Sequence, residues 1–426
     1  MFLTRESKNK NMKIVIYTHD TFGLGNIRRM LLIAEHLNQS IKDASILLIS
    51  SSPMLHAFRL GKGIDYIKLP TISRNIQGEY QTRTLGMTLQ DMVKMRADLI
   101  LSAVRNFSPD VILVDKKPLG LKRELTATLR FLKEQKAPTK VYLVLRDILD
   151  RPDVTHRYWR KKGYFNVIEH YYNQVLILGD KTVYDAARLY HFPFACQQLV
   201  HYCGYLRRSG EDLKDAQWVR KQLGIGKEKI ILLTTGGGAD GERILTHFLQ
   251  FWRRHDLGKD VHAVVVHGPE LCPQTQQQIT SIAGQCRQVS LLEFTPHLPS
   301  FMNAAEVVIS MGGYNTLCEA LSLNKRILCI PRVTPVSEQL IRASRFAQLG
   351  MLQLVHPDEL TARKLATALH QLLEEKQTIL PGAALSFDAL EQIEKQLTKE
   401  LPNHKLPPPV RLAAQKAAFP AYRVSK

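Results

Sequence analysis

The chain of 426 residues has little cysteine, no long hydrophobic run and no D-x-D motif. Because no run reaches about 18 apolar residues, we expect no membrane-spanning helix. Residues 1–12 are polar and lack the apolar core of a signal peptide, which favours a cytoplasmic protein. The six cysteines form no C-x-x-C pair, so a zinc site and a disulfide framework are both disfavoured. We expect no metal and no other cofactor.

Acidic residues are scarce in the first half of the chain and absent from its last 26 residues. Residues 1–200 hold 31 Lys/Arg against 18 Asp/Glu, whereas residues 201–400 hold 22 against 21. A basic first half suggests an anionic ligand, an acidic lipid surface or nucleic acid as its partner, although general solubility would explain it equally well. No RNA-binding motif and no stripe of aromatic and basic residues support nucleic acid, so we expect none.

The pattern of apolar segments predicts two α/β domains. Short, continuously apolar segments alternate with helical ones, which is typical of parallel strands covered on both faces. We expect an N-terminal domain over 1–205, a second over 206–380, a helix within 381–401 and a flexible basic, proline-containing tail over 402–426. The predicted strands are 13–18, 45–50, 111–115, 141–145, 175–179, 229–235, 261–267, 289–294, 307–311, 327–331 and 352–355. The predicted helices include 89–106, 120–135, 180–189, 211–223 and 384–401.

Each half opens with a strand, a glycine-rich turn and an amphipathic helix. A glycine turn at a helix start leaves backbone N–H groups free and directs the positive end of the helix dipole toward an anion. The residues of these two turns are candidate ligand-binding residues: Gly23, Gly25, Asn26 and Arg28 in the first half, and Gly236, Gly237, Gly238 and Asp240 in the second.

The segment 307–331 is the most specific part of the sequence. A strand ends in Gly312 and Gly313, a helix follows, and a second strand ends at a proline. Thr316 adds a hydroxyl donor, and the Glu319 carboxylate is placed to accept hydrogen bonds from a ribose diol. An alternative needs no ligand, because Thr316 and Glu319 also form the T-x-x-E pattern of a capping box.

These motifs resemble the donor-binding signature of GT-B glycosyltransferases, in the family of the peptidoglycan N-acetylglucosaminyltransferase, and the whole chain looks like a group of bacterial predicted glycosyltransferases. The segment from Glu338 to Ala343 is similar to that family's H-Q-x-x-N-A. The resemblance implies two Rossmann-like domains facing a cleft, with a UDP-sugar on the C-terminal domain and no metal. It implies that Gln339 contacts the sugar and that an arginine of G-x-x-x-R reaches the phosphates. The donor-binding residues implied in this way also include Arg207, Arg208, Phe294, Thr295 and Asn315.

The sequence departs from that family where its first loop usually has a histidine. Asn26 occupies that position, and an amide is not a base at neutral pH. His19, Asp20 and Asp115, at the ends of predicted strands, are the candidate replacements, and Arg146 is a candidate acceptor-binding residue. Each of these residues also has a structural interpretation. His19 would stabilise a turn, Asp115 would cap the next helix or pair with a lysine, and Arg146 would be an exposed surface residue.

The sequence therefore predicts an inverting, metal-independent glycosyltransferase of the hexosyltransferase type. It would move a sugar from a nucleotide diphosphate donor to a lipid-linked or polysaccharide-precursor acceptor at the inner face of the plasma membrane. A nucleotide-sugar hydrolase or 2-epimerase on the same fold is the alternative. An oxidoreductase that binds its cofactor at the first glycine turn is disfavoured. Arg28 occupies the position of the third glycine of the G-x-G-x-x-G motif, and no Asp or Glu lies at the end of the second strand.

Overall fold

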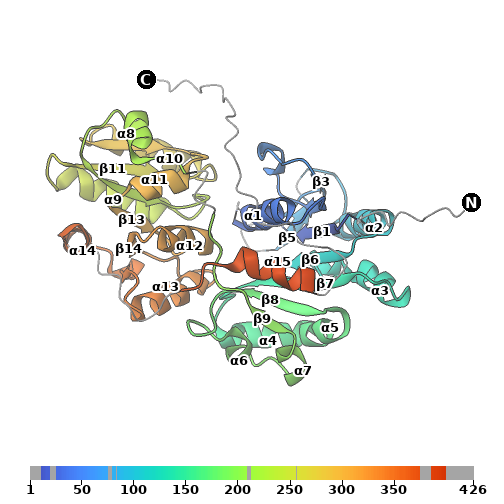
Figure 1. The fold of residues 1–426 in the computed structure, drawn as a ribbon. Helices are drawn as coiled ribbons and strands as arrows, with labels where there is room; N and C mark the ends of the chain where they lie inside the picture. Colours follow the sequence, from blue (N-terminus) through green and yellow to red (C-terminus); the bar gives the residue numbers. More distant parts are fainter. Residues whose placement is uncertain are drawn as a thin grey trace, which may run out of the picture.

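A computed structural model describes residues 11–19, 25–74, 79–82, 84–208, 213–255, 257–374 and 385–399 of the chain. They form two α/β lobes, each built around its own parallel sheet (Figure 1). The expected α/β class with two parallel sheets is thereby confirmed. Within the described residues, no helix is both long and apolar enough to cross a membrane.

The N-terminal sheet has the strand order β3-β2-β1-β6-β7-β8-β9, and the C-terminal sheet the order β12-β11-β10-β13-β14-β15. Every pairing in both sheets is parallel. The strands are β1 Lys13–Thr18, β2 Ser45–Ser50, β3 Ile64–Lys68, β6 Val111–Asp115, β7 Lys140–Arg146, β8 Gln174–Leu178, β9 Val200–Tyr202, β10 Lys229–Thr234, β11 Val261–Val266, β12 Val289–Leu292, β13 Val307–Ser310, β14 Arg326–Cys329 and β15 Gln353–Leu354. An antiparallel hairpin joins β4 Ile72–Arg74 to β5 Tyr80–Thr82.

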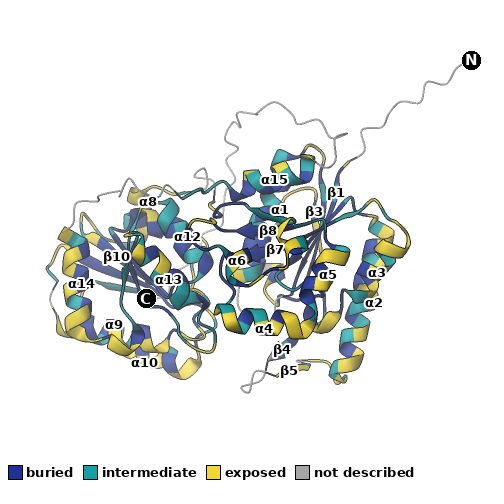
Figure 2. Ribbon diagram, turned by 90° about the horizontal axis from the view of Figure 1, so that it is seen from below, coloured by how far each residue is buried: buried dark blue, intermediate teal, exposed yellow. Residues whose placement is uncertain are grey.

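Helices cover both faces of each sheet, which explains why the strands are apolar at successive positions. In β1, Ile14 and Ile16 enter one buried cluster, whereas Val15 and Tyr17 enter another on the opposite face. Buried strands inside and exposed helix faces outside are visible in Figure 2. The helices of the N-terminal lobe are α1 Gly25–Ser40, η1 Leu55–Ala57, α2 Leu89–Phe107, η2 Leu121–Arg123, α3 Thr126–Glu134, α4 Pro152–Lys162, α5 Tyr164–Tyr171, α6 Ala186–Leu189 and α7 Phe194–Gln197.

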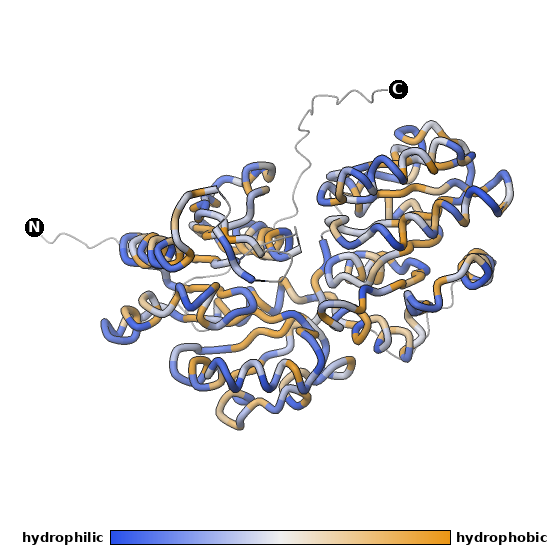
Figure 3. The backbone as a smooth tube through the Cα atoms, turned by 180° about the vertical axis from the view of Figure 1, so that it is seen from behind, coloured by the Kyte–Doolittle hydropathy of each residue, from blue (hydrophilic) through white to orange (hydrophobic). Residues whose placement is uncertain are grey.

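The C-terminal lobe repeats this arrangement, and its helices carry one apolar side toward the sheet (Figure 3). In α9, for example, Ile244, Leu245, Phe248, Leu249 and Trp252 are all buried, as their 3.6-residue spacing predicts. The helices of this lobe are α8 Ala216–Leu223, α9 Glu242–Arg254, α10 Pro273–Ala283, α11 Leu298–Ala304, α12 Tyr314–Ser322, α13 Glu338–Gln348, η4 Pro357–Glu359 and α14 Ala362–Glu374.

The last helix, α15 (Ala389–Lys399), returns to the N-terminal lobe and packs against α1. His36 of α1 and Glu394 of α15 lie 3.0 Å apart, and the Tyr205 N–H donates to the Ser386 carbonyl at 2.7 Å. The Tyr205 ring contacts Tyr314 and Phe346 of the C-terminal lobe as well as Phe387 before α15. The chain therefore crosses between the lobes twice, and both crossings meet at Tyr205.

Several predicted elements were wrong in extent. The helix predicted at 180–189 is only α6, because the Asp180 carboxylate caps the Thr182 N–H and holds a turn. The helix predicted at 120–135 is interrupted by positive φ values at Gly120, Lys122 and Arg123, so α3 starts at Thr126. Strands β3 and β9 and the β4–β5 hairpin were not predicted. The strand predicted at 289–294 ends at Leu292, and α15 is shorter than 384–401. Residues 211–212 of the predicted helix 211–223 and the predicted tail 402–426 lie outside the described residues, and α8 begins only at Ala216.

Candidate functional site

A cavity of about 440 Å³ lies between the two lobes, at the carboxyl ends of strands from both sheets. Parallel α/β sheets bind ligands at this edge, because the loops that follow the strands converge there. The N-terminal lobe contributes Gly25, Asn26, Arg28, Arg29 and Arg146 to its lining. The C-terminal lobe contributes Thr234, Thr235, Gly236, Gly237, Gly238, Ala239, Asp240, Val266, Glu270, Glu293, Phe294, Thr295, Leu298, Met311, Gly313, Tyr314, Asn315, Thr316, Arg332, Glu338 and Gln339.

The three glycines after β10 form one wall of this cavity. Gly236 and Gly238 have φ values of 69° and 95°, a backbone conformation that side chains rarely adopt. A Cβ on Gly238 would lie 2.2 Å from the His267 carbonyl oxygen, so glycine is also required by the close approach of the loop after β11. Helix α9 starts shortly afterward, and its N-cap residue, Gly241, makes no side-chain capping hydrogen bond. The loop therefore presents backbone to the cavity, as predicted.

The double glycine after β13, the strand next to β10, forms the adjoining wall, and Gly313 is the member of the pair that lines the cavity. Gly312 has a φ of 80° and is buried, and its carbonyl accepts from Arg342 Nη1 at 3.1 Å. Helix α12 begins at Tyr314 with Gly313 as its N-cap, and no side chain caps it. Thr316 lies inside the first turn and lines the cavity, so the capping-box alternative for Thr316 and Glu319 is wrong. The amide of Asn315 donates to the Gly25 carbonyl at 2.9 Å, which ties the starts of α12 and α1 together.

Glu319 does not face the main cavity. It lines a crevice of about 20 Å³ beside it, together with Arg28, Arg207 and Arg208, and its carboxylate lies 3.4 Å from the Arg208 guanidinium. Burial lowers the pKa of Arg28, and the Glu319 charge opposes that shift. The predicted donor contacts of Arg207, Arg208 and Glu319 would thus be made from this crevice, at the edge of the cavity.

Three further predicted residues lie on the wall formed by the C-terminal lobe. Phe294 is 53% exposed and lines the cavity beside Thr295, whose hydroxyl accepts from the His297 N–H at 3.1 Å. Gln339 also lines it, with its side-chain oxygen accepting from the Arg332 N–H. Of the predicted first-loop residues, Gly25, Asn26 and Arg28 reach the cavity. Asp20 and Gly23 lie outside the described residues.

Asp115, at the end of β6, is buried and ion-paired. Its Oδ1 accepts from Arg29 Nη2 at 2.6 Å, and Arg29 also donates to the Asn26 side chain at 3.1 Å. Both partners of the Asp115–Arg29 pair are at most 2% exposed, and Asp115 is not among the residues that line the cavity. The carboxylate therefore positions Arg29 and, through it, Asn26. One structural alternative for Asp115 was an ion pair with a lysine, and the structure pairs it with Arg29 instead.

His19, at the end of β1, is buried and has a defined tautomer. Its Nδ1 lies 3.1 Å from the Asp115 carbonyl oxygen. A carbonyl only accepts, so Nδ1 carries the hydrogen and Nε2 keeps its lone pair. Burial, together with the charges of Lys117 and Lys116, holds the pKa of His19 well below its usual range. The imidazole is therefore neutral at pH 7, which is the form a general base requires. Like Asp115, His19 is not among the residues that line the cavity.

Ion pairs between charged residues connect the two lobes beside the cavity. Arg146, the last residue of β7, donates to Glu338 at the start of α13 at 3.1 Å. The next residue, Asp147, accepts from Arg342 one turn further along α13 at 2.7 and 2.9 Å. Arg332 lies 2.7 Å from Asp240 and 3.7 Å from Glu338. Burial alone would raise the pKa of Glu338, but the charges of Arg146, Lys116, Arg342 and Arg332 lower it to about 2.

The sequence analysis did not predict most of these ion pairs. Arg146 was predicted as an acceptor-binding residue, and Glu338 was named only as the first residue of the segment similar to H-Q-x-x-N-A. The pairing of Asp147 with Arg342 was not predicted. The available signal was the adjacent opposite charges at 146–147 and the opposite charges four residues apart at 338 and 342. The sequence alone does not indicate that the segment at 146–147 lies close to the segment at 338–342 in the folded chain.

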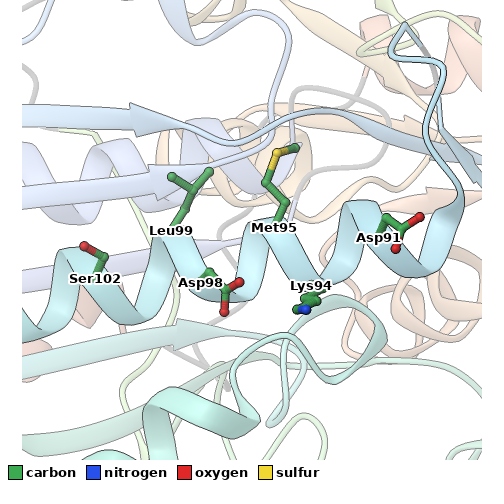
Figure 4. A pocket seen from close by; sticks show the side chains of 6 residues that line it. All are labelled: Asp91, Lys94, Met95, Asp98, Leu99 and Ser102. Atoms are coloured by element: carbon green, nitrogen blue, oxygen red, sulfur yellow. The ribbon is translucent and has the colours of Figure 1, made fainter.

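A second hollow, of about 400 Å³, runs along the outer side of α2. Figure 4 shows its six lining side chains, all projecting from that one helix, with Met95 and Leu99 beside Asp91, Asp98, Lys94 and Ser102. No loop and no side chain of another described element lines this hollow. The convergence of several elements that marks a site is found in the cavity between the lobes.

Comparisons with known proteins place the C-terminal lobe in a family. Residues 231–400 match the model of the glycosyltransferase family 28 C-terminal domain. Over 188 residues the chain is 25% identical to an uncharacterized glycosyltransferase of Methanopyrus kandleri, covering 44% of this chain and 51% of that protein. Over 178 residues it is 28% identical to the UDP-N-acetylglucosamine–N-acetylmuramyl-(pentapeptide) pyrophosphoryl-undecaprenol N-acetylglucosamine transferase of Geobacillus kaustophilus, covering 39% and 45%. The matched region thus spans about half the length of these relatives.

Solved structures resemble the whole chain. MurG of Acinetobacter baumannii matches with a TM-score of 0.57 and 13% identity, covering 91% of this chain and 99% of that one. The UDP-GlcNAc 2-epimerase of Neisseria meningitidis matches with a TM-score of 0.59 and 16% identity, covering 92% and 99%. These likenesses establish the two-lobed fold. The chain has the two-lobed fold of GT-B glycosyltransferases, and its residues 231–400 match the glycosyltransferase family 28 C-terminal domain.

Proposed function

We propose that this chain transfers a sugar from a nucleotide diphosphate donor, a UDP-sugar, to a hydroxyl acceptor. The observation that carries the proposal is the pair of glycine loops, 236–238 and 312–313, which follow the neighbouring strands β10 and β13 at one cavity and precede helices whose N-cap residues are glycines. Free N–H groups at helix starts bind phosphate oxygens. The family 28 match covers both loops, and the transferase of Geobacillus kaustophilus named above uses UDP-N-acetylglucosamine.

The donor would lie against the C-terminal lobe, with its diphosphate between the two glycine loops. Phe294 and Thr295 would border the base, and Gln339 would contact the sugar hydroxyls. Glu319 would accept from the ribose diol at the edge of the crevice that it shares with Arg208. Because amides, helix dipoles and nearby arginines would neutralise the diphosphate, we propose that transfer needs no metal ion.

We propose that transfer inverts the anomeric configuration and that His19 is the general base. Its Nε2 lone pair would take the proton of the acceptor hydroxyl as that oxygen attacks the anomeric carbon and the nucleoside diphosphate leaves. The neutral tautomer supports this assignment, since Nδ1 is held by the Asp115 carbonyl. Asn26, bound to Arg29, would serve as a positioning residue.

The acceptor would enter from the N-terminal lobe, near Arg28 and Arg146. The basic first half of the chain favours an acceptor that carries phosphate, such as a lipid-linked precursor at the cytoplasmic membrane surface. Vesicles of anionic lipid test this part. Sedimentation with them, lost at high salt and absent with neutral lipid, is the expected result.

Donor binding is the direct test of the proposal. The purified chain would be titrated with UDP-sugars and GDP-sugars, with binding followed by saturation-transfer NMR. We expect a UDP-sugar to bind through both its base and its sugar. Binding to neither class would contradict the proposal. Release of free sugar without an acceptor, or exchange at sugar C2, would identify a hydrolase or a 2-epimerase instead.

A further inference from the structure

Arg28 is a cation at the junction of the cavity and the neighbouring crevice. It lines both of them, whereas Glu319 lines only the crevice. Among the described residues, the Arg28 guanidinium makes no hydrogen bond and no ion pair. The next residue on α1, Arg29, is by contrast neutralised by Asp115 at 2.6 Å. Arg28 therefore has its N–H donors available for a ligand in the cavity.

The starts of α1 and α12 set Arg28 opposite Glu319. The side-chain amide of Asn315 donates to the Gly25 carbonyl at 2.9 Å, which joins the first turns of the two helices. Arg28 follows Gly25 by three residues on α1, and Glu319 follows Asn315 by four on α12, so each lies on the same side of its helix as the residue at that contact. Both side chains then reach one crevice, from opposite lobes.

Glu319 does not balance the positive charge around it. Its carboxylate lies 3.4 Å from Arg208 Nε, which has no hydrogen-bond partner, so the contact is ionic and leaves the carboxylate able to accept from a ligand. Arg207 adds an exposed cation to the same crevice. Burial lowers the pKa of Arg28, the Glu319 charge raises it and the Arg208 charge lowers it. Three arginines thus share one carboxylate, and an anion beside Arg28 would stabilise its charged form.

We propose that Arg28 binds the donor phosphate that is attached to the ribose. This inference deepens the proposed function and rests on it, because it takes Glu319 as the residue that accepts from the ribose diol. The first phosphate is bonded to that same ribose, so it lies one sugar ring away from the diol. Arg28 lines the cavity beside Glu319, and a guanidinium offers paired N–H donors that match phosphate oxygens. The donor is then held by a cation of the N-terminal lobe as well as by the glycine loops of the C-terminal lobe.

The test compares Arg28→Gln with Arg28→Lys and with the control Arg243→Gln. Glutamine removes the charge and breaks no ion pair within the described residues. Arg243 is a suitable control because it lies in the first turn of α9 but is 52% exposed, pairs with Asp358 at 3.0 Å and does not line the cavity. Isothermal titration of each full chain with UDP, UMP and uridine isolates the effect on each phosphate, since uridine has none.

Arg28→Gln is expected to weaken the binding of UDP and of UMP by the same factor, roughly 10- to 100-fold, which corresponds to the loss of one charge-assisted contact. Uridine binding should stay unchanged. Arg28→Lys should keep part of the affinity for UDP, and Arg243→Gln all of it. If Arg28→Gln does not fold, Arg28→Met is the substitute.

Three other results overturn the inference and leave the proposed function intact. Equal weakening of all three ligands means that Arg28 acts through Glu319 and the ribose. Weakening of UDP alone places Arg28 at the outer phosphate. Unchanged binding of UDP and UMP is the result expected if Arg28 contacts the acceptor instead. A wild-type chain that binds no UDP overturns both the inference and the proposed function.

Discussion

Arg342 and Asp147 form a buried, two-pronged ion pair across the boundary between the lobes. Nε and Nη2 of Arg342 donate to Asp147 at 2.9 and 2.7 Å, and both side chains are 1% exposed. Arg342 also donates to the Gly312 carbonyl, in the glycine loop that lines the cavity. The relative position of the lobes and the shape of the donor loop therefore depend on the same guanidinium group.

Replacing either partner alone should destabilise the protein strongly. Arg342→Ala or Asp147→Ala leaves one buried charge without its partner, which costs about 3–5 kcal/mol. Urea unfolding followed by tryptophan fluorescence measures the change. As a control, Arg157→Ala breaks the exposed Arg157–Asp153 pair and should cost less than about 1 kcal/mol. Equal effects of the buried and exposed changes would refute this reading.

The Arg146–Glu338 pair should respond to charge reversal and recover when both charges are exchanged. Arg146→Glu places two carboxylates together, and Glu338→Arg places the new guanidinium beside Arg146 and Arg332. We expect each single variant to show a larger radius of gyration by X-ray scattering and weaker donor binding. The double variant should regain much of both. If the effects of the two single substitutions simply add in the double variant, the pair does not couple the lobes.

The stability contribution of Glu338 should disappear at acidic pH. Its pKa is lowered to about 2 in the folded chain, against about 4.5 normally, so between these values the unfolded state binds more protons. The contribution, on the order of 3 kcal/mol, is present above about pH 4.5 and is lost as the pH falls toward about 2. The difference in unfolding free energy between wild type and Glu338→Gln should therefore shrink over this range.

His19→Asn should separate catalysis from donor binding. The introduced amide can still donate to the Asp115 carbonyl, but it has no basic nitrogen. We expect the transfer rate to fall about 10²- to 10⁴-fold with donor affinity unchanged. In the wild type, the pKa of His19 is held well below its usual range, which predicts a transfer rate that stays level from neutral pH through the ordinary histidine range and falls only at more acidic pH. A variant with normal kcat would exclude His19 as the base.

Continuous apolar strands such as Ser45–Ser50 and Val261–Val266, separated by helical segments, determined the two parallel sheets from the sequence alone. They did so because a strand covered on both faces must be apolar at successive positions. The glycine loops were also predictable, since positive φ and close backbone approach leave little choice but glycine. Strand β9, with only three residues, carried too little pattern to be predicted.

Only the tertiary structure decided which charges meet. Arg146 and Glu338 are separated by 192 positions, and Asp147 and Arg342 by 195. No local rule relates such residues, because their pairing follows from how two independently formed sheets are set against each other. The same holds for the Asp115–Arg29 pair and for the hydrogen bond that fixes the His19 tautomer. The sequence thus determined which backbone faces the cleft, whereas the packing of the two lobes determined the charge state and orientation of the side chains within it.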